Sequence, residues 1–188
     1  MRKVEIALKN VLSEDRIEEF LSVGTLIKIK KGEHYIREGE IPKKLGFVLS
    51  GLFRYVYINQ EGKEYTKGLV QENTFLTSYS AMITETSSYF FVEALEDAEL
   101  FTISYEKWKR LLDSDNYWYK FLVSFVEKGF ITKEKRERDL LLLNAETRYR
   151  DFLQNYPEIE NRISQTIIAS YLGIQPESLS RIRKKMGT

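Results

Sequence analysis

The 188-residue sequence has no cysteine, a single histidine and three prolines. Without cysteine the chain cannot form a disulfide, a thiolate metal site, a cysteine-ligated iron–sulfur cluster or a cysteine nucleophile. No apolar run approaches the roughly 20 residues needed to cross a bilayer, and the N-terminal segment MRKVEIALKN lacks the apolar core of a signal peptide. These absences predict a cytoplasmic protein with no membrane segment.

Patterns typical of catalysis are missing as well. The lone histidine, His34, leaves little basis for a serine–histidine–aspartate set, and the sequence has neither a glycine-rich phosphate loop nor the HExxH spacing of a zinc site. Carboxylate pairs carry no weight among 28 acidic residues, because chance alone supplies such pairs. We therefore expect no enzyme, no catalytic residue, no metal and no cofactor.

The first two thirds of the chain favour a small sheet domain. Residues 4–22 show helical spacing, and from Gly24 onward apolar and polar residues alternate with period two, rich in β-branched and aromatic types. Dipeptides that end in glycine at positions 32, 39, 51 and 62 indicate turns between the strands, and a second group of strands spans residues 89–104. This pattern predicts an antiparallel β-roll within an α+β fold. A hydrophobic content of 43% suffices for one full core plus a smaller one, which favours two domains or a domain with an appendage.

A long helix is expected over residues 115–143, after a short one at 105–112. Its seam repeats at steps of four and three, the spacing of a coiled coil, and the expected dimer contacts are Trp118, Leu122, Phe125, Gly129 and Arg136. Two interpretations remain open for this helix. It either packs on its own roll or forms a two-fold dimer axis.

The segment QTIIASYLGIQPESLSRIRK, residues 165–184, has the pattern of a helix-turn-helix. Small Ala169 lets two helices approach closely, Gly173 can take the positive φ that ends the first helix, and Pro176 suits the first turn of the second. The apolar positions expected to bury the inner faces are Ile168, Leu172, Ile174, Leu179 and Ile182. The alternative interpretation is an ordinary helical hairpin with solvated charges.

Charge is concentrated beside this motif. Residues 161–188 hold five basic side chains and one acidic one, a net +4 in a chain whose total is +1. A local positive potential is what a phosphate backbone requires. The expected DNA contacts are Ser164, Gln165, Thr166, Gln175, Glu177, Ser178, Arg181, Lys184 and Lys185.

The order of these parts resembles the Crp/Fnr superfamily of bacterial transcription regulators. The segment KKGEHYIREGEIPKKLGFVLSGLFRYVY is similar to that superfamily's cyclic-nucleotide-binding domain, and TRYRDFL precedes the helix-turn-helix. The resemblance implies a sensor domain at residues 1–114, a dimerisation helix at 115–143 and a minimal DNA-binding domain at 144–188. It also implies a homodimer that binds double-stranded DNA, with RNA polymerase and an unidentified small-molecule effector as further candidate partners.

The sequence departs from the cyclic-AMP-responsive members at the phosphate site. Those members place an Arg-Ser-Ala where this chain has Ser88-Tyr89-Phe90, so the phosphate-binding arginine is missing. An unpaired buried phosphate costs several kcal/mol, and cyclic AMP is therefore not the expected effector. A ligand pocket would instead be lined by Thr77, Ser78, Tyr79, Met82, Ser88, Tyr89 and Phe91; alternatively, these aromatic residues fill the roll.

The sequence thus predicts a sequence-specific DNA-binding regulator that acts as a homodimer. The rival hypothesis is a dimeric small-molecule sensor or protein-interaction module whose DNA-binding head is not used.

Overall fold

The computed structural model describes residues 2–187, which fall into two compact units. The first unit comprises the chain up to Lys63 together with Lys67–Asp115. The second comprises Glu64–Thr66 and the chain from Asn116 onward, so the long helix is grouped with the C-terminal helices.

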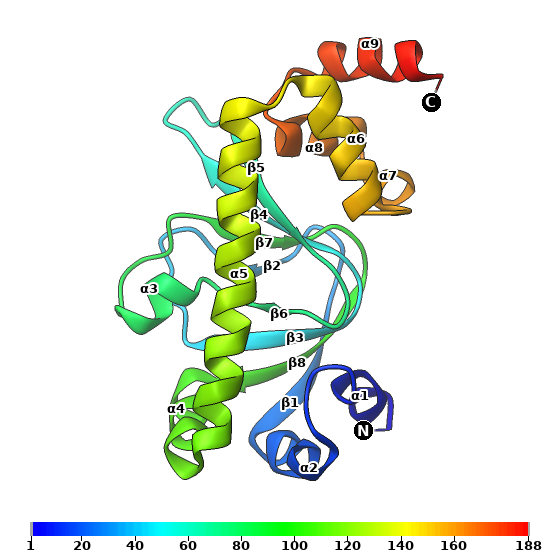
Figure 1. Ribbon diagram of the computed structural model, residues 1–188. Helices are drawn as coiled ribbons and strands as arrows, with labels where there is room; N and C mark the ends of the chain where they lie inside the picture. Colours follow the sequence, from blue (N-terminus) through cyan, green and yellow to red (C-terminus); the bar gives the residue numbers. More distant parts are fainter. Residues whose placement is uncertain (1, 188) are drawn as a thin grey trace. The chain divides into compact units, whose positions relative to one another are not determined.

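Two four-stranded sheets form the roll of the first unit (Figure 1). One sheet has the order β1-β8-β3-β6, and the other has the order β2-β7-β4-β5. The pairings β1–β8, β3–β8, β3–β6, β2–β7 and β4–β7 are antiparallel. The strands are β1 (Gly24–Ile29), β2 (His34–Ile36), β3 (Lys44–Ser50), β4 (Phe53–Ile58), β5 (Glu64–Val70), β6 (Phe75–Leu76), β7 (Phe91–Ala94) and β8 (Ala98–Ser104).

Buried side chains from both sheets build the core of the roll. One cluster joins the two sheets and includes Val48, Phe53, Leu76, Val92 and Leu100, each of which is fully buried. Burial does not alternate along the inner strand β3, where residues 45–49 are all buried. The predicted antiparallel roll is confirmed.

The predicted turns also occur, because the glycines at 32, 39, 51 and 62 all have positive φ. Gly51 is the most constrained of them. Its φ is +100°, and an added Cβ would lie 2.5 Å from Cβ of Ala98. Only glycine fits this turn between β3 and β4 without moving the neighbouring backbone.

Four helices accompany the strands in the first unit: α1 (Arg2–Leu8), α2 (Glu14–Val23), α3 (Tyr79–Ile83) and α4 (Tyr105–Ser114). The Ser104 hydroxyl caps α4 by accepting from the backbone N–H of Lys107. Arg16 of α2 pairs with Asp115 at 2.7 Å, just beyond the end of α4. The sequence predicted the helices at residues 4–22 and 105–112, whereas α3 was not predicted.

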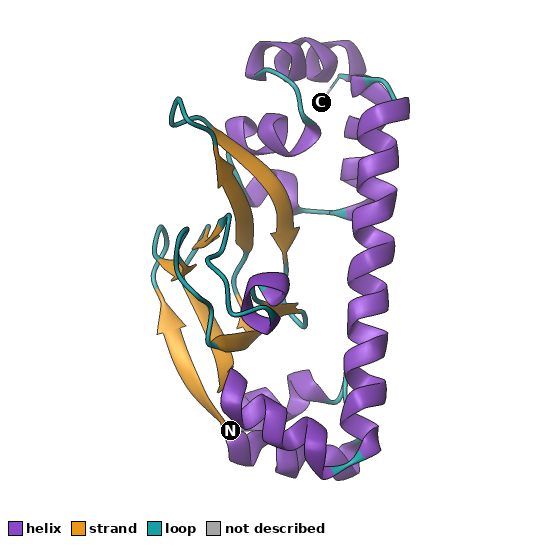
Figure 2. Cartoon of the chain, turned by 90° about the vertical axis from the view of Figure 1, so that its left-hand side faces the viewer, coloured by secondary structure: helices purple, strands orange, loops and turns teal. Residues whose placement is uncertain are grey.

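Five helices follow in the second unit: α5 (Asn116–Leu142), α6 (Ala145–Asn155), α7 (Ile159–Arg162), α8 (Gln165–Leu172) and α9 (Pro176–Met186). Asn144 and Ser164 cap α6 and α8 through their side-chain oxygens. Helix α7 was not predicted. Strands are confined to the roll and helices make up the C-terminal part (Figure 2), so the predicted α+β fold class is confirmed.

Candidate functional site

Helices α8 and α9 form the predicted helix-turn-helix. Gly173 ends α8 in the left-handed conformation with φ +68°, and an added Cβ would lie 3.1 Å from Cδ2 of Leu140. Pro176 occupies the first turn of α9, where its missing N–H leaves no helical hydrogen bond unmade. Ala169 is fully buried, as expected for the point where two helices approach closely.

The inner faces of these helices build a small core with α6 and α7. Its fully or nearly fully buried members are Tyr149, Phe152, Ile159, Ile168, Ala169, Leu172 and Leu179. Ile174 and Ile182 are half-buried instead of buried, so they lie at the edge of this core. Burial of one face leaves the opposite face of α9 available to a partner.

Most of the expected DNA-binding side chains lie on that open side. Gln175, Glu177, Arg181, Lys184 and Lys185 are exposed on or just before α9. At the start of α8, the exposed residues are Ser164, Gln165 and Thr166, while Ser178 on α9 is half-buried. The Ser164 hydroxyl already accepts a hydrogen bond from the Ile167 N–H as the helix cap, so its acceptor is in part used.

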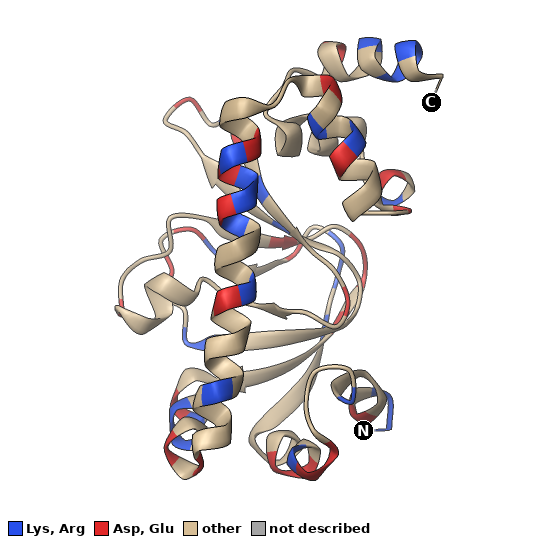
Figure 3. Ribbon diagram, in the orientation of Figure 1, with Lys and Arg blue, Asp and Glu red and all other residues tan. Residues whose placement is uncertain are grey.

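Basic residues lie along the C-terminal part of α9 (Figure 3), and they differ in their partners. Lys185 pairs with Glu146 of α6 at 2.6 Å, and Arg183 pairs with Glu160 of α7 at 3.1 Å. The Lys185 ammonium donates a hydrogen bond to the Glu146 carboxylate and lowers the pKa of that carboxyl. Within residues 2–187, the side chains of Arg181 and Lys184 have no ion pair or hydrogen bond. Sequence reasoning treated Lys184 and Lys185 alike, whereas the structure distinguishes them.

In the roll, the expected pocket residues divide between its interior and its surface. Met82 and Phe91 are buried and Thr77 and Tyr79 are half-buried, whereas the Tyr89 side chain is 81% exposed and points away from the interior. Phe91 stacks on His34 with ring centroids 4.5 Å apart. Its neighbour Phe90 belongs to the interior cluster, so Phe90, and not Phe91, faces the roll interior.

Two buried serines stand where the cyclic phosphate would be expected. The Ser88 hydroxyl lies 2.9 Å from the Ser78 hydroxyl and 2.7 Å from the carbonyl oxygen of Phe90. The Thr77 hydroxyl donates to the carbonyl oxygen of Lys44 at 2.9 Å. These groups therefore satisfy one another and bring no positive charge to the site.

A cation that the sequence did not reveal lies beside Phe90. The Lys67 ammonium is 3.8 Å from the centroid of the Phe90 ring and 5.4 Å from that of Tyr57. Tyr55 packs at the same place, and burial raises the pKa of its hydroxyl. No sequence signal connects Lys67 of β5 with Phe90, because Phe90 lies just before β7 and far from Lys67 in the sequence.

The expected dimer-contact residues of α5 differ in exposure. Trp118 is fully buried within the chain, and the guanidinium of Arg136 donates to the carbonyl oxygen of Tyr171 within the same unit. Leu122 and Phe125 are half-buried and Gly129 is exposed. The exposed apolar residues follow a neighbouring line on the helix, at Tyr119, Val123, Val126 and Phe130.

Comparison with known proteins finds relatives of this chain. The cyclic nucleotide-binding domain family matches residues 26–115. The anaerobic regulatory protein of Bacillus subtilis (strain 168) is 25% identical over 134 residues, which are 71% of this chain and 56% of that protein. The chain thus matches little more than half the length of this relative.

Solved structures share the fold over most of the chain. The c-di-GMP-responsive global regulator CLP of Xanthomonas campestris has a TM-score of 0.77 at 18% identity, with 93% of this chain and 92% of that chain covered. FixK2 of Bradyrhizobium japonicum has a TM-score of 0.79 at 17% identity, covering 88% and 85%. An Eubacterium rectale protein assigned to the Crp/Fnr family of transcriptional regulators has a TM-score of 0.73 at 19% identity, covering 96% and 86%.

No helix among residues 2–187 has the length and apolar character to span a membrane, and no group of three or more potential metal ligands occurs among these residues. The sequence resemblance is confirmed at the level of the fold: residues 26–115 match the cyclic nucleotide-binding domain family, and the chain shares its fold with a solved structure assigned to the Crp/Fnr family of transcriptional regulators.

Proposed function

We propose that this protein is a transcription regulator that binds a two-fold-symmetric DNA operator as a homodimer. The observation that carries the proposal is the helix-turn-helix whose second helix, α9, exposes Gln175, Glu177, Arg181 and Lys184. An arginine in this position can bridge O6 and N7 of guanine, and a glutamate can accept from the amino group of cytosine. Lys184, near the end of the same helix, is expected to contact phosphate.

Selection from random genomic fragments tests this proposal directly. Fragments retained by the full-length protein at moderate salt should share a two-fold-symmetric sequence, with half-sites about 34–36 Å apart. A protein-interaction module with an unused head would retain fragments without sequence preference, or none at all. That result would favour the rival hypothesis.

Dimerisation through α5 is part of the same proposal. Tyr119, Val123, Val126 and Phe130 recur at steps of four, three and four, and each is 41–64% exposed. An apolar line of this spacing on a long helix suits knobs-into-holes packing against a second copy. Leu122 and Phe125, predicted earlier as dimer contacts, flank this line and remain predictions for its edge.

Substitutions on the exposed apolar line of α5 test dimerisation without disturbing the fold of the single chain. Replacing Val126 and Phe130 with Glu places like charges across the two-fold axis and removes roughly 1.5–3 kcal/mol of burial for each large side chain. Sedimentation should show that the variant is a monomer. Its circular dichroism should show an intact roll, and its binding to the operator should be weaker. A variant that remains dimeric would place the interface elsewhere.

The roll is proposed not to respond to cyclic AMP. Ser88 occupies the position of the phosphate-binding arginine, and its hydroxyl is already engaged with Ser78 and Phe90. Calorimetric titration with cyclic AMP at micromolar concentrations should show no heat of binding. Stoichiometric binding would mean that another cation, such as Lys67 beside Phe90, neutralises the phosphate.

A further inference from the structure

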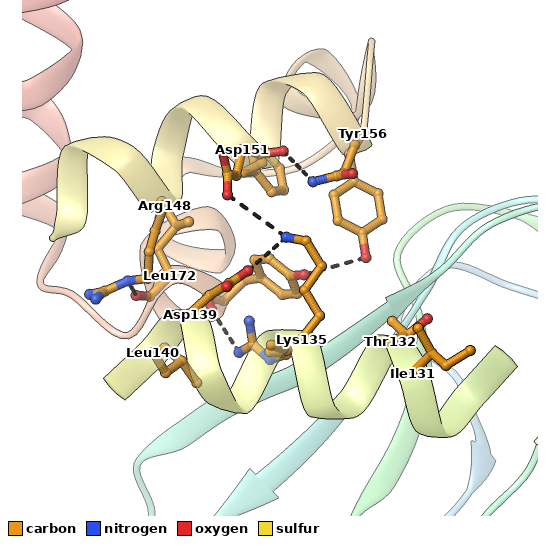
Figure 4. A pocket seen from close by; sticks show the side chains of 13 residues that line it. Ile131, Thr132, Lys135, Asp139, Leu140, Arg148, Asp151, Tyr156 and Leu172 are labelled. Carbon is orange, nitrogen blue, oxygen red and sulfur yellow. Dashed lines mark hydrogen bonds and ion pairs between the residues drawn. The ribbon is translucent and has the colours of Figure 1, made fainter. Parts of the chain in front are cut away.

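The C-terminal end of α8 is held by two arginines from other helices of the same unit. Arg136 of α5 donates to the carbonyl oxygen of Tyr171 at 2.7 Å. Arg148 of α6 donates through Nε to the carbonyl oxygen of Leu172 at 3.0 Å (Figure 4). We call Arg136 and Arg148 the arginine clasp.

Together with the turn, the clasp satisfies the whole end of α8. The last four carbonyl groups of a helix have no partner within the helix, and they carry its negative partial charge. The N–H groups of Ile174 and Gly173 bind the carbonyl oxygens of Ala169 and Ser170 at 3.0 and 3.2 Å. The remaining two carbonyls, of Tyr171 and Leu172, are those that the clasp binds with charge-assisted hydrogen bonds.

Arg148 also binds the end of the long helix. A second nitrogen of its guanidinium donates to the carbonyl oxygen of Leu143, the residue after the last one of α5. One planar group therefore links the end of α5 to the end of α8, which a lysine with its single ammonium cannot reproduce in the same geometry. Arg136 adds a stacking contact, with its guanidinium carbon 4.0 Å from the centroid of the Tyr171 ring.

Open space lies beside the clasp. A cavity of about 300 Å³ is lined by α5, α6 and α8, and its walls include both arginines, Tyr171, Leu172 and Leu140 (Figure 4). Side chains do not fill this part of the interface between the helices. The orientation of α8 relative to α5 therefore depends more on the directional bonds of the clasp than on close packing there.

We infer that Arg136 and Arg148 are positioning residues that fix the helix-turn-helix relative to the long helix and thereby set the spacing between half-sites that the dimer accepts. This inference rests on the proposed function, since spacing has meaning only for two heads on one operator. Helix α9 follows α8 after a turn of three residues, so a rotation of α8 about its end carries the recognition face with it.

The chain offers closely matched controls. Arg138 lies on α5 two residues beyond Arg136, and Arg150 lies on α6 two residues beyond Arg148. Both controls are about 60% exposed and pair with carboxylates, Asp139 and Glu146, instead of helix carbonyls. Replacing each of the four arginines with Gln removes the same charge from the same two helices.

The first experiment measures spacing preference with the full-length protein and the selected operator. Operators with the spacer unchanged or altered by one or two base pairs are compared, together with a single half-site. In Arg136→Gln and Arg148→Gln, preference for the parent spacer should fall about tenfold, as expected for loss of a charge-assisted hydrogen bond, while half-site affinity is kept. Arg138→Gln and Arg150→Gln should retain the preference. Equal losses on every DNA, the half-site included, would overturn the inference.

The second experiment does not use DNA. Because the chain has no cysteine, Glu134→Cys on α5 and Ser180→Cys on α9 allow nitroxide labelling at two chosen sites, with unlabelled protein in excess to isolate distances within one chain. The distance distribution should broaden in the clasp variants and stay narrow in the controls. An unchanged distribution in Arg148→Gln would refute the clasp even if operator binding is normal. Broadening in a protein that binds no two-fold operator would support the clasp as a hinge constraint, while the proposed function and the spacing role would both be lost.

Discussion

The roll and the helix-turn-helix unit are stabilised in different ways. In the roll, twelve buried residues from both sheets form one apolar cluster, and the buried hydroxyls of Ser78 and Ser88 bond to each other. In the second unit, the small core built by α6 to α9 is supplemented by the arginine clasp and by ion pairs such as Lys185–Glu146. A cavity remains unfilled beside the clasp.

This difference predicts how each region responds to substitution. The hydrophobic effect stabilises a fold but has no preferred direction, so removing buried side chains from the roll should lower the free energy of unfolding. Hydrogen bonds to helix ends are directional, so losses in the clasp should change the orientation of α9 more than its stability. Four predictions test or refine this contrast.

The largest effect is expected in the roll. Phe53 is completely buried in the apolar cluster, and Phe53→Ala should lower the free energy of unfolding by about 3–5 kcal/mol because it leaves a cavity in a packed interior. Urea denaturation followed by circular dichroism measures the change. Tyr89→Ala, at a side chain 81% exposed in the same unit, is the control and should change stability little. A small effect at Phe53 would mean that the interior is loosely packed.

A smaller loss of stability is expected in the head. Ala169 is fully buried where α8 meets its neighbours, so Ala169→Leu should overpack the site and cost about 1–3 kcal/mol. Thermal unfolding measures it. Ser180→Leu, on the exposed side of α9, adds similar bulk without overpacking. If Ala169→Leu is neutral, the adjoining space accommodates the side chain and the small core is adaptable.

On the exposed face of α9, substitutions should change binding and leave stability unaltered. Arg181→Ala should cost about 1–3 kcal/mol on the operator and relax preference at one base pair, because a base-edge contact is lost. Lys184→Ala should weaken all sequences alike and flatten the salt slope by about one. Binding isotherms on specific and scrambled DNA at several salt concentrations distinguish the two. Equal losses on both DNAs for Arg181→Ala would assign that arginine to phosphate.

The smallest effect concerns Glu146, whose ordinary pKa of 4.5 is lowered by the hydrogen bond from Lys185. A lowered pKa in the folded state means that the ion pair stabilises above pH 4.5 and is lost as the pH falls through the lowered value. Glu146→Gln should therefore reduce thermal stability slightly at pH 7, with the difference disappearing in acid. Glu177→Gln, which removes an exposed carboxylate on α9, should show no such convergence. A constant difference across the pH range would assign the effect to packing.

Local sequence signals predicted much of the fold. Period-two alternation located the strands, glycines marked the turns, and Gly173 with Pro176 located the helix-turn-helix. The exposed apolar line of α5 could not be located from the sequence, because spacing alone does not say which of two neighbouring lines on a helix is already covered within the chain. Trp118 is covered, and Tyr119 is exposed.

The candidate sites were less predictable because their partners come from distant parts of the sequence. Alternation alone did not show whether Phe90 or Phe91 faces inward, since the loop before β7 resets the pattern. Arg148 carried no signal either, because its partners are main-chain carbonyls and any residue type supplies those. Lys185 is among the expected DNA contacts, and its ion pair with Glu146 of α6 could not be foreseen from the sequence.

The main-chain character of the clasp bears on how such a regulator can evolve. Arg136 and Arg148 bind carbonyl oxygens of Tyr171 and Leu172, which every substitution at these positions leaves in place. The side chains on the outer face of α9 can therefore be exchanged without disturbing the bonds that orient the helix. Under the proposed function, a change in the preferred DNA sequence would then leave the geometry of the dimer intact.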